Sequence, residues 1–219
     1  MNNFLKSRSE IDTCTQFLRD NNLIEHGISA KNWDIARIAP LLEDGNLLDM
    51  GADGSFILHN AIRRNLAGRK VGVDLLPVSE HNKADGAEYF QSDLMQTPFR
   101  RGEFDTITCL SVVEHEVDYC AFAKEVSRLL KKGGKCWITF DYWNPKVSTE
   151  GKKLYGLNWN ILDQADTMNM VAEFKKKGLE LTSDIDWTTQ EQVINSRYCS
   201  PFPDCAYTFG ILMFTKTKK

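Results

Sequence analysis

The spacing of apolar and polar residues separates an N-terminal segment from the rest of the chain. In this segment, apolar side chains recur at helical intervals, as at Ile11, Cys14 and Leu18. A second helical stripe, NWDIARIAPLL, contains Pro40, which we expect to end or kink its helix. Residues 1–45 are therefore predicted to form an N-terminal helical cap.

After this segment, short apolar runs alternate with helical patterns. The runs are typical of buried strands and cover residues 46–50, 70–74, 88–92, 104–110, 136–140, 179–187 and 207–214. Helices are expected between them, for example over residues 119–130 and 163–177, and a turn at residues 133–135. Buried strands that alternate with helices indicate a parallel, doubly wound sheet covered on both faces. We therefore expect an α/β fold for residues 46–219, as a single globular unit.

The segment 188–205, TTQEQVINSRYCSPFPDC, breaks this pattern. It is polar and contains two prolines, so we expect it to lie outside the sheet and to form the rim of a pocket.

Composition and charge narrow the classes of partner. The net charge is -3 and the sequence pI is about 5.8, without a basic face, so the sequence predicts no nucleic acid partner. No apolar run reaches the roughly 18 residues that span a bilayer, and the N-terminus lacks a signal-peptide pattern. We expect a cytoplasmic protein with a small-molecule partner, and the sequence leaves its oligomeric state open.

Candidate ligand-binding residues follow the successive predicted strands. Ligands of such sheets bind outside the carboxyl ends of the strands. Asp49 and Gly51 end the first strand, where a glycine allows a sharp turn and close approach to a ligand. Asp74 ends the second strand and is suited to accept hydrogen bonds from ribose hydroxyls.

Two further groups follow the third and fourth strands. Asp93 and Leu94 are suited to hold the amino group of an adenine and cover its ring. The segment 110–118, LSVVEHEVD, ends the central strand. Each residue also has a purely structural interpretation, because an aspartate can cap a helix and Glu114 and His115 can begin one in solvent. Their joint order along the strands favours a binding site.

The stretch from Asn46 to Phe140 resembles class I S-adenosylmethionine (SAM)-dependent methyltransferases, particularly the type 11 small-molecule group. LLDMG is similar to the first motif of that family and KVGVD to the second. SDLMQTPFRRGEFDTITCLSVVEH and LLKKGGKCWITF resemble its later motifs. The resemblance implies a Rossmann-like, seven-stranded sheet of order 3-2-1-4-5-7-6 with the seventh strand antiparallel. It also implies SAM as cofactor and S-adenosylhomocysteine as product.

The resemblance assigns a role to each matching position. It implies that Gly51 lies near the methionine moiety, with Asp49 preceding it, and that Asp74 binds the ribose. Asp93 and Leu94 would contact the adenine. By the same resemblance, Leu110 and Ser111 would lie beneath the cofactor.

The turn after the first strand departs from the family pattern. The family has further glycines two and four positions after Gly51, where this chain has Asp53 and Ser55, with Gly54 between them. Asp53 is expected either to oppose the cofactor carboxylate, to pair with its amino group, or to point away if Gly54 adopts glycine-specific angles.

Methyl transfer requires an aligned acceptor and, for a hydroxyl or amine, a base. His115 is the candidate base and Glu114 the residue that orients it, whereas the alternative is that His115 only packs or caps a helix. Some quinone-pathway O-methyltransferases bind a metal through an ExxEH pattern here. Ser111 replaces the first glutamate, so we predict no metal.

Aromatic residues are candidates for the acceptor pocket. Tyr142 and Trp143 end the fifth strand, and Tyr155 and Trp159 lie in the following insertion, where they are expected to form a lid. The sequences SRSEIDTCTQFL and KNWD resemble, faintly, those of methyltransferases of bacterial surface-sugar pathways.

The sequence thus predicts SAM-dependent methylation of a small molecule, with O-methylation of a sugar or another metabolite as the specific hypothesis. Two alternatives remain open. One is a catalytically inactive scaffold with the same fold, which Asp53 and Ser55 favour. The other is an NAD(P)-dependent oxidoreductase, which is less favoured because GADGSF does not match GxGxxG.

Overall fold

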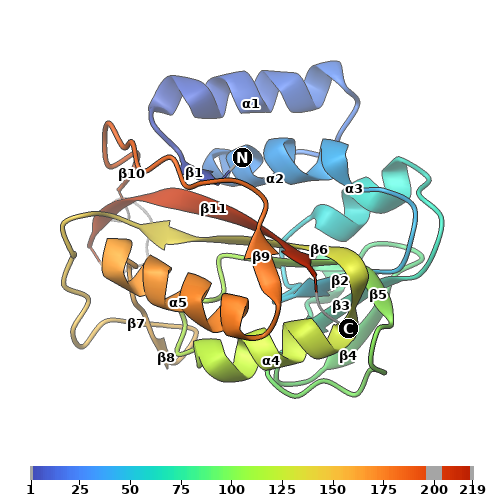
Figure 1. Cartoon of the computed structure of the whole chain (residues 1–219). Coiled ribbons are helices and arrows are strands. Elements are labelled where there is room, and N and C mark those ends of the chain that lie inside the picture. Colours follow the sequence, from blue (N-terminus) through green and yellow to red (C-terminus); the bar gives the residue numbers. More distant parts are fainter. Residues whose placement is uncertain (1, 196–203, 218–219) are drawn as a thin grey trace.

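The computed structural model describes residues 2–195 and 204–217 and has a central sheet between two helical layers (Figure 1). The strands in chain order are β1 (Asn3–Phe4), β2 (Leu47–Met50), β3 (Lys70–Asp74), β4 (Glu88–Gln91), β5 (Phe104–Leu110), β6 (Leu130–Tyr142), β9 (Leu179–Leu181), β10 (Ile194–Asn195) and β11 (Ala206–Lys216). A separate hairpin pairs β7 (Lys153–Leu154) with β8 (Leu157–Asn158).

The order of the sheet confirms the predicted topology. Its strands run β4-β3-β2-β5-β6-β11, with β9 paired to the outer edge of β11. In the predicted numbering this order is 3-2-1-4-5-7-6. The strands from β2 to β6 are parallel, and β11 is antiparallel to β6, as expected for the seventh strand.

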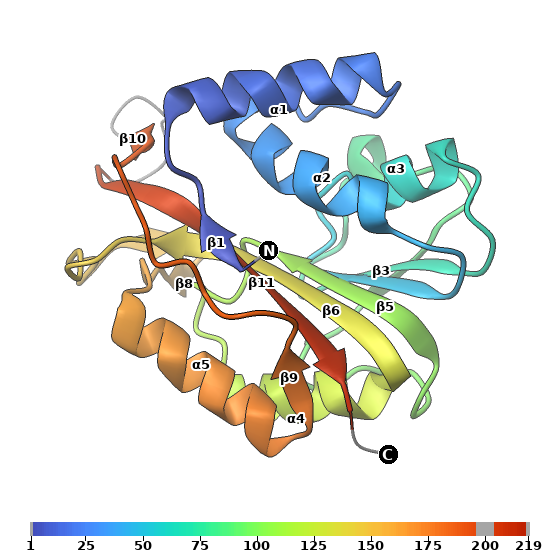
Figure 2. The same cartoon turned by 45° about the horizontal axis from the view of Figure 1, so that its top comes forward.

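Five α-helices of the described residues cover the two faces. They are α1 (Arg8–Asp20), α2 (Asn32–Ile38), α3 (Ile57–Arg63), α4 (Tyr119–Leu129) and α5 (Gln164–Lys176). The first three lie on one face and the last two on the other (Figures 1 and 2). The sequence itself begins α4 and α5, because Asp118 accepts hydrogen bonds from two backbone amides of α4, and Asp163 forms a capping box with Asp166.

The pleat of β6 directs its side chains alternately into the two halves of the core. Ile138, Phe140 and Tyr142 pack in the cluster that includes Phe122 of α4. Trp137 packs instead in the cluster on the side of α2, and Asp141 has the same parity as Trp137. Neighbouring residues at the end of β6 therefore serve opposite faces of the sheet.

The periodicity predicts a helical N-terminal segment, but this segment begins with the strand β1. Asn3 and Phe4 pair with Ile211 and Gly210 of β11 (Figure 2). The amide of Leu5 continues this contact by donating to the carbonyl oxygen of Phe209 at 2.8 Å. Two strand residues are too few to show a period, so helical spacing dominated the pattern.

Three other expectations near the sheet are corrected. The Gly133-Gly134 pair lies inside β6, where the pairing with β5 is irregular, and not in a turn before the strand. The strand expected over residues 179–187 ends at Leu181. The segment 188–205 contributes β10, although its polarity predicted no strand, because strand pairing uses backbone groups. Its residues 196–203 lie outside the described residues.

Among the described residues, no helix combines the length and the apolar character that crossing a lipid bilayer requires.

Candidate cofactor and acceptor site

The turn after β2 depends on a glycine. Gly51 has a φ of +78°, and a β-carbon there would lie 2.2 Å from Cγ2 of Val112. Both the backbone angle and the close approach exclude a side chain. The turn is held from below by the Gly51 amide, which donates to the carbonyl oxygen of Val73 at 2.8 Å.

Asp49 supports this turn from inside the sheet. Its side chain is fully buried and accepts a hydrogen bond from the hydroxyl of Thr108 at 2.7 Å and another from the hydroxyl of Ser55. Burial raises the pKa of Asp49 to about 7. Ser55, which departs from the glycine pattern, therefore holds the turn against β2.

Asp53 ties the same turn to the segment after β3. Its carboxylate accepts hydrogen bonds from the amide of Ser79 at 3.1 Å and from Nδ2 of Asn82 at 2.8 Å. Gly54 follows with a φ of +80°, the glycine-specific conformation that allows the turn to continue in this direction. The carboxylate of Asp53 is therefore directed into contacts made by the protein itself.

Asp74 ends β3, and Asp93 follows the adjacent parallel strand β4. Asp74 pairs in register with Gln91, so the two carboxylates lie at the same edge of the sheet. Asp74 accepts from the amides of Asp53 at 3.2 Å and Leu76 at 3.1 Å. Asp93 is exposed and accepts from the amide of Met95 at 2.8 Å.

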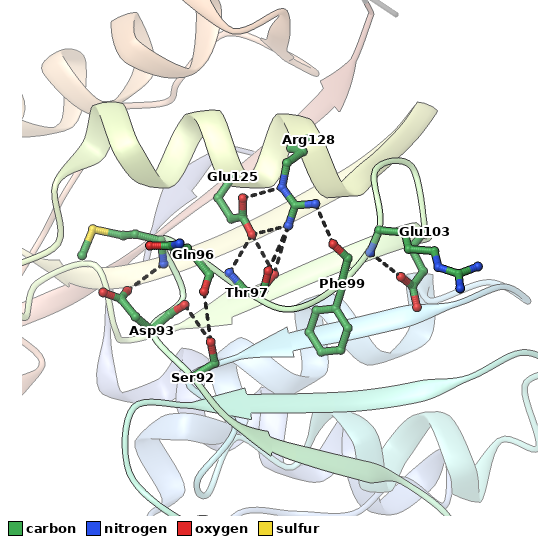
Figure 3. Close-up of polar contacts among 10 residues, drawn as sticks. Ser92, Asp93, Gln96, Thr97, Phe99, Glu103, Glu125 and Arg128 are labelled. Carbon is green, nitrogen blue, oxygen red and sulfur yellow. Dashed lines mark hydrogen bonds and ion pairs between the residues drawn. The ribbon is translucent and has the colours of Figure 1, made fainter.

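A charged pair on α4 holds the loop that follows Asp93 (Figure 3). The carboxylate of Glu125 accepts from the amide of Thr97 at 2.8 Å and from its hydroxyl at 2.7 Å. Arg128 pairs with Glu125 at 2.6 Å and donates to the carbonyl oxygen of Phe99 at 2.6 Å. Leu94 packs against the core from this loop. The charged pair therefore finds its partners within the protein.

A cavity of about 330 Å³ opens beside the turn after β2. Among the described residues, Gly51, Leu110 and Ser111 line this cavity, whereas Asp74 and Asp93 do not. Ser111 has a φ of +53°, and its hydroxyl accepts a hydrogen bond from Lys31. The cavity therefore joins the predicted position of the methionine moiety to the space beyond β5.

Three buried carboxyl groups line the far part of this cavity. Asp34, Glu114 and Asp141 are 0%, 1% and 5% exposed. Oδ1 of Asp34 and Oε2 of Glu114 have no hydrogen-bond partner among the described residues. Burial is the main cause that raises the pKa of all three groups, and Asp141 raises that of Glu114 further.

His115 lies in the same cavity as a neutral imidazole. Burial, with a smaller contribution from Lys31, lowers its pKa to about 4. Its Nδ1 has no hydrogen-bond partner in the described part of the chain, so this atom does not donate to the carboxylate of Glu114 that was predicted to orient the ring. Its ring meets that of Tyr155 edge to face, with the centroids 5.6 Å apart.

The cavity includes Tyr155 but not the other three aromatic residues predicted for the acceptor pocket. Tyr142 stacks on Phe4 in the core with the centroids 3.9 Å apart, because the pleat of β6 turns it away from the face of Asp141. Trp143 is half-buried and packs against the core cluster on the side of α2. Trp159 is buried and donates to Asp141 at 2.8 Å.

The sequence pattern did not indicate several residues that line this cavity. Asp34 lies on α2, Asp141 on β6, and Tyr207 and Phe209 on β11. The sequence did contain a signal for Asp141. In CWITFDY it alternates in step with Trp137, so both side chains point to the face of the sheet that α2 covers. The N-terminal and C-terminal segments meet there only in three dimensions.

No group of three or more histidine, cysteine, aspartate or glutamate side chains in the described residues has an arrangement that could hold a metal ion.

Part of the chain is similar in sequence to known methyltransferases. Residues 48–138 match a family model described as methyltransferase domain. The chain is thus similar to methyltransferases over residues 48–138. It is 30% identical over 139 residues to a ubiquinone biosynthesis O-methyltransferase of Psychrobacter cryohalolentis, covering 58% of this chain and 52% of the relative. It is 27% identical to a demethylmenaquinone methyltransferase of Lactococcus lactis, over 49% and 48% of the two chains. The chain thus spans about half the length of these curated relatives.

A solved structure shares the fold of the methyltransferase domain. It is that of geranyl diphosphate C-methyltransferase from Streptomyces coelicolor, with S-adenosylhomocysteine bound, a TM-score of 0.58 and 18% identity. The match covers 88% of this chain and 87% of that one.

The residues present fit SAM, the cofactor of this domain class. The glycine turn leaves room for close backbone approach of the cofactor, and Leu110 and Ser111 line the cavity beside it. Asp74 and Asp93 lie along the same edge of the sheet, on the side of β3 and β4. The cofactor-binding roles of these residues, with those of Leu94, Leu110 and Ser111, stay predictions.

Proposed function

We propose that this protein transfers a methyl group from SAM to a hydroxyl oxygen of a small metabolite. The observation that carries the proposal is one cavity lined by the glycine turn after β2, by Leu110 and Ser111 at the end of β5, and by Glu114 and His115. Two of the relatives reported above are named for methylation in quinone biosynthesis, one of them at oxygen. The net charge of -3 favours a small molecule over a nucleic acid as acceptor.

The chemistry asks little of the side chains beyond alignment. SAM supplies a methyl group on a positively charged sulfur, and the electron pair of the broken carbon–sulfur bond stays on sulfur, which leaves S-adenosylhomocysteine. The acceptor oxygen forms the new bond to carbon, and its hydroxyl proton passes to a base of the protein. Holding the reacting atoms about 3–3.5 Å apart supplies much of the rate enhancement.

Two residues are proposed for the proton transfer. His115 is neutral at pH 7, so its ring nitrogen is available to accept a proton, although a pKa of about 4 makes it a weak base in the unliganded protein. Glu114 has the higher proton affinity that burial gives a carboxylate, and its Oε2 has no partner among the described residues. Developing positive charge on His115 would be stabilised by Glu114 nearby.

The side chains around the far part of the cavity bear on the acceptor. Tyr155, at the turn of the β7–β8 hairpin, and Tyr207 and Phe209 from β11 give it an aromatic wall. Such walls suit the flat faces of a sugar or of a ring metabolite. A sugar acceptor remains the specific form of the proposal.

Calorimetric titration with SAM, S-adenosylhomocysteine and NAD tests the proposal first. We expect S-adenosylhomocysteine to bind and NAD not to bind. Binding of NAD alone would favour an oxidoreductase, and binding of no nucleoside would favour an inactive scaffold.

Replacing His115 tests the assignment of the base. The variant His115→Ala should bind S-adenosylhomocysteine as the natural protein does and form it more slowly from SAM and the acceptor. Full activity would remove His115 from the proposal and leave Glu114 as the base.

A further inference from the structure

We propose that the acceptor carries a protonated amino group, which the buried carboxyl groups of Glu114 and Asp141 bind beside the reaction centre. This inference rests on the proposed function, and it specifies the chemistry of the acceptor. It applies equally to an amino sugar and to another hydroxylated amine.

The position of Asp141 separates it from the residues predicted to bind the ribose and the adenine. Asp74 ends β3 and Asp93 follows β4, on one side of β2, whereas Asp141 lies near the end of β6, two strands away on the other side. Neighbouring strands lie about 4.8 Å apart, so β6 runs about 10 Å from β2. A cofactor that extends from Asp93 to the Gly51 turn therefore leaves the space at β6 for the acceptor.

The charges in this part of the cavity do not balance. Asp34, Glu114 and Asp141 supply three carboxyl groups, and Lys31 is the one lysine or arginine among the described lining residues. Nζ of Lys31 lies 3.7 Å from Asp34 and also donates to Ser111, so Asp34 is its nearest acidic partner. His115 adds no positive charge, because its imidazole is neutral. Glu114 and Asp141 have no cation of their own among the described lining residues.

Glu114 also has hydrogen-bonding capacity that the described residues do not use. Its side chain is 1% exposed, and Oε2 has no partner among the described residues although it lines the cavity. An unsatisfied buried oxygen costs about 1–3 kcal/mol, so such groups in proteins call for a specific explanation. A donor that arrives with the ligand satisfies this oxygen, and an ammonium group has three donors.

The aromatic residues of the cavity favour the same kind of ligand. Lys31 already places its ammonium 4.2 Å from the centroid of the Phe209 ring, which shows that this wall accepts a cation on its face. Tyr155 and Tyr207 line the cavity as well. Carboxylates and aromatic faces together are the surroundings that recognise an amine, whereas a neutral sugar can donate hydrogen bonds to the carboxylates but brings no charge to pair with them.

The direction in which burial shifts the pKa values of Glu114 and Asp141 supports this interpretation. Their raised pKa values mean that the positive charge within the protein does not offset the cost of burying the two ionised groups. In the cluster of Glu125 and Arg128, by contrast, the hydrogen bonds and the cation within the protein lower the pKa of the glutamate. The cavity is therefore built to be completed by a ligand.

Matched pairs of small probes test the inference. The protein is first saturated with S-adenosylhomocysteine and then titrated by calorimetry with glucosamine against glucose and with benzylamine against benzyl alcohol. In each pair, an amine replaces a hydroxyl. At least one amine should bind about tenfold or more tightly than its alcohol partner, because a charge-assisted hydrogen bond in a buried site contributes about that much.

Charge-removing variants locate the effect. Glu114→Gln and Asp141→Asn keep the shape of each side chain and should weaken amine binding about tenfold or more, with S-adenosylhomocysteine affinity unchanged. Glu43→Gln is the matched control, because Glu43 pairs with Lys135 at an exposed position outside the cavity. It should leave both affinities unchanged.

The outcomes separate this inference from the proposed function. No binding of S-adenosylhomocysteine overturns the proposed function itself. If S-adenosylhomocysteine binds but the alcohols bind as tightly as the amines, or neither amine binds, the amine inference is overturned. The amine inference is also overturned if Glu114→Gln weakens the binding of S-adenosylhomocysteine more than the binding of the amine, because the carboxylate would then contact the cofactor. Binding of Mg²⁺ that depends on Glu114 would replace the amine with a metal.

Discussion

Two clusters of charged residues on opposite sides of the sheet differ in how completely the protein satisfies them. Around Glu125 and Arg128, each carboxylate oxygen and guanidinium group reaches a partner on α4 or on the loop of Thr97 and Phe99. Around Glu114, three carboxyl groups share one lysine, and two oxygens have no partner in the described residues.

The difference indicates two separate tasks. A satisfied network fixes a loop in one position, which suits the segment predicted to contact the adenine. An unsatisfied one stores unfavourable desolvation that a suitable ligand relieves on binding. Four substitutions test this contrast, and the first concerns the glycine turn after β2.

Gly51→Ala should have the largest effect. The positive φ and the contact with Val112 together cost about 4 kcal/mol of folding free energy, and S-adenosylhomocysteine should no longer bind measurably. Urea denaturation and calorimetry measure the two losses. Gly54→Ala is the control, since it has a similar φ but its nearest neighbour lies 3.7 Å away, so it should cost about 1 kcal/mol. Equal losses in the two variants would contradict the role of Val112.

Arg128→Leu should destabilise the protein by about 3 kcal/mol, because it leaves the carboxylate of Glu125 buried without its cation. It should also weaken the binding of S-adenosylhomocysteine, because the loop of Thr97 and Phe99 loses its hydrogen bonds to Arg128. Urea denaturation measures the first effect and calorimetry the second. The exposed Arg101 offers a control, and Arg101→Leu should change neither quantity. A stable Arg128→Leu variant with natural affinity would show that the network does not position the loop.

Asp74→Ala should weaken binding of S-adenosylhomocysteine by about 10- to 100-fold, the contribution of hydrogen bonds to a charged acceptor. Calorimetry measures the change. Asp85→Ala, at an exposed position, should bind as the natural protein does. An unaltered affinity in Asp74→Ala would withdraw the assignment of this residue to the ribose.

Glu114→Gln should have the smallest effect on folding, with a stability at pH 7 equal to or up to about 1 kcal/mol above that of the natural protein. The matched change Glu125→Gln should instead destabilise, because Glu125 is paired with Arg128. Denaturation curves of both variants measure the contrast. Destabilisation by Glu114→Gln as large as that by Glu125→Gln would remove the distinction between the clusters.

The difference in folding stability between the natural protein and the Glu114→Gln variant should increase as the pH rises. Because the pKa of Glu114 is raised in the folded state, folding takes up a proton above the usual glutamate pKa of about 4.5, and stability falls with rising pH. The glutamine side chain of the variant does not titrate, so the advantage of Glu114→Gln should grow above about pH 4.5. A difference that stays constant from about pH 4 to about pH 8 would contradict the raised pKa.

The sheet could be predicted from the sequence because its strands carry strong local signals. KVGVD and FDTITCL are short apolar runs bounded by polar residues, and the structure places β3 and β5 on these same residues. β1 and β10 are short and polar at one position each, so only their pairing with β11 defines them.

The candidate site was predictable in part, for the same reason. Residues directly after strands, such as Gly51 and Ser111, are found by position alone. The side of the sheet that a strand-end residue faces depends on the pleat, and this is why Tyr142 lies in the core while Asp141 lines the cavity. Asp34 comes from a helix whose position over the sheet is set by tertiary packing, which no local pattern encodes.

The pairing of β1 with β11 has a consequence for biosynthesis. The hydroxyl of Thr208 donates to the carbonyl oxygen of Leu5 at 2.6 Å, across 203 residues of sequence. A nascent chain that leaves the ribosome amino end first cannot complete this pairing until β11 has been translated. Lys31 and Asp34 can then reach Phe209 only after β11 has emerged, so the pocket should mature after the parallel strands of the sheet.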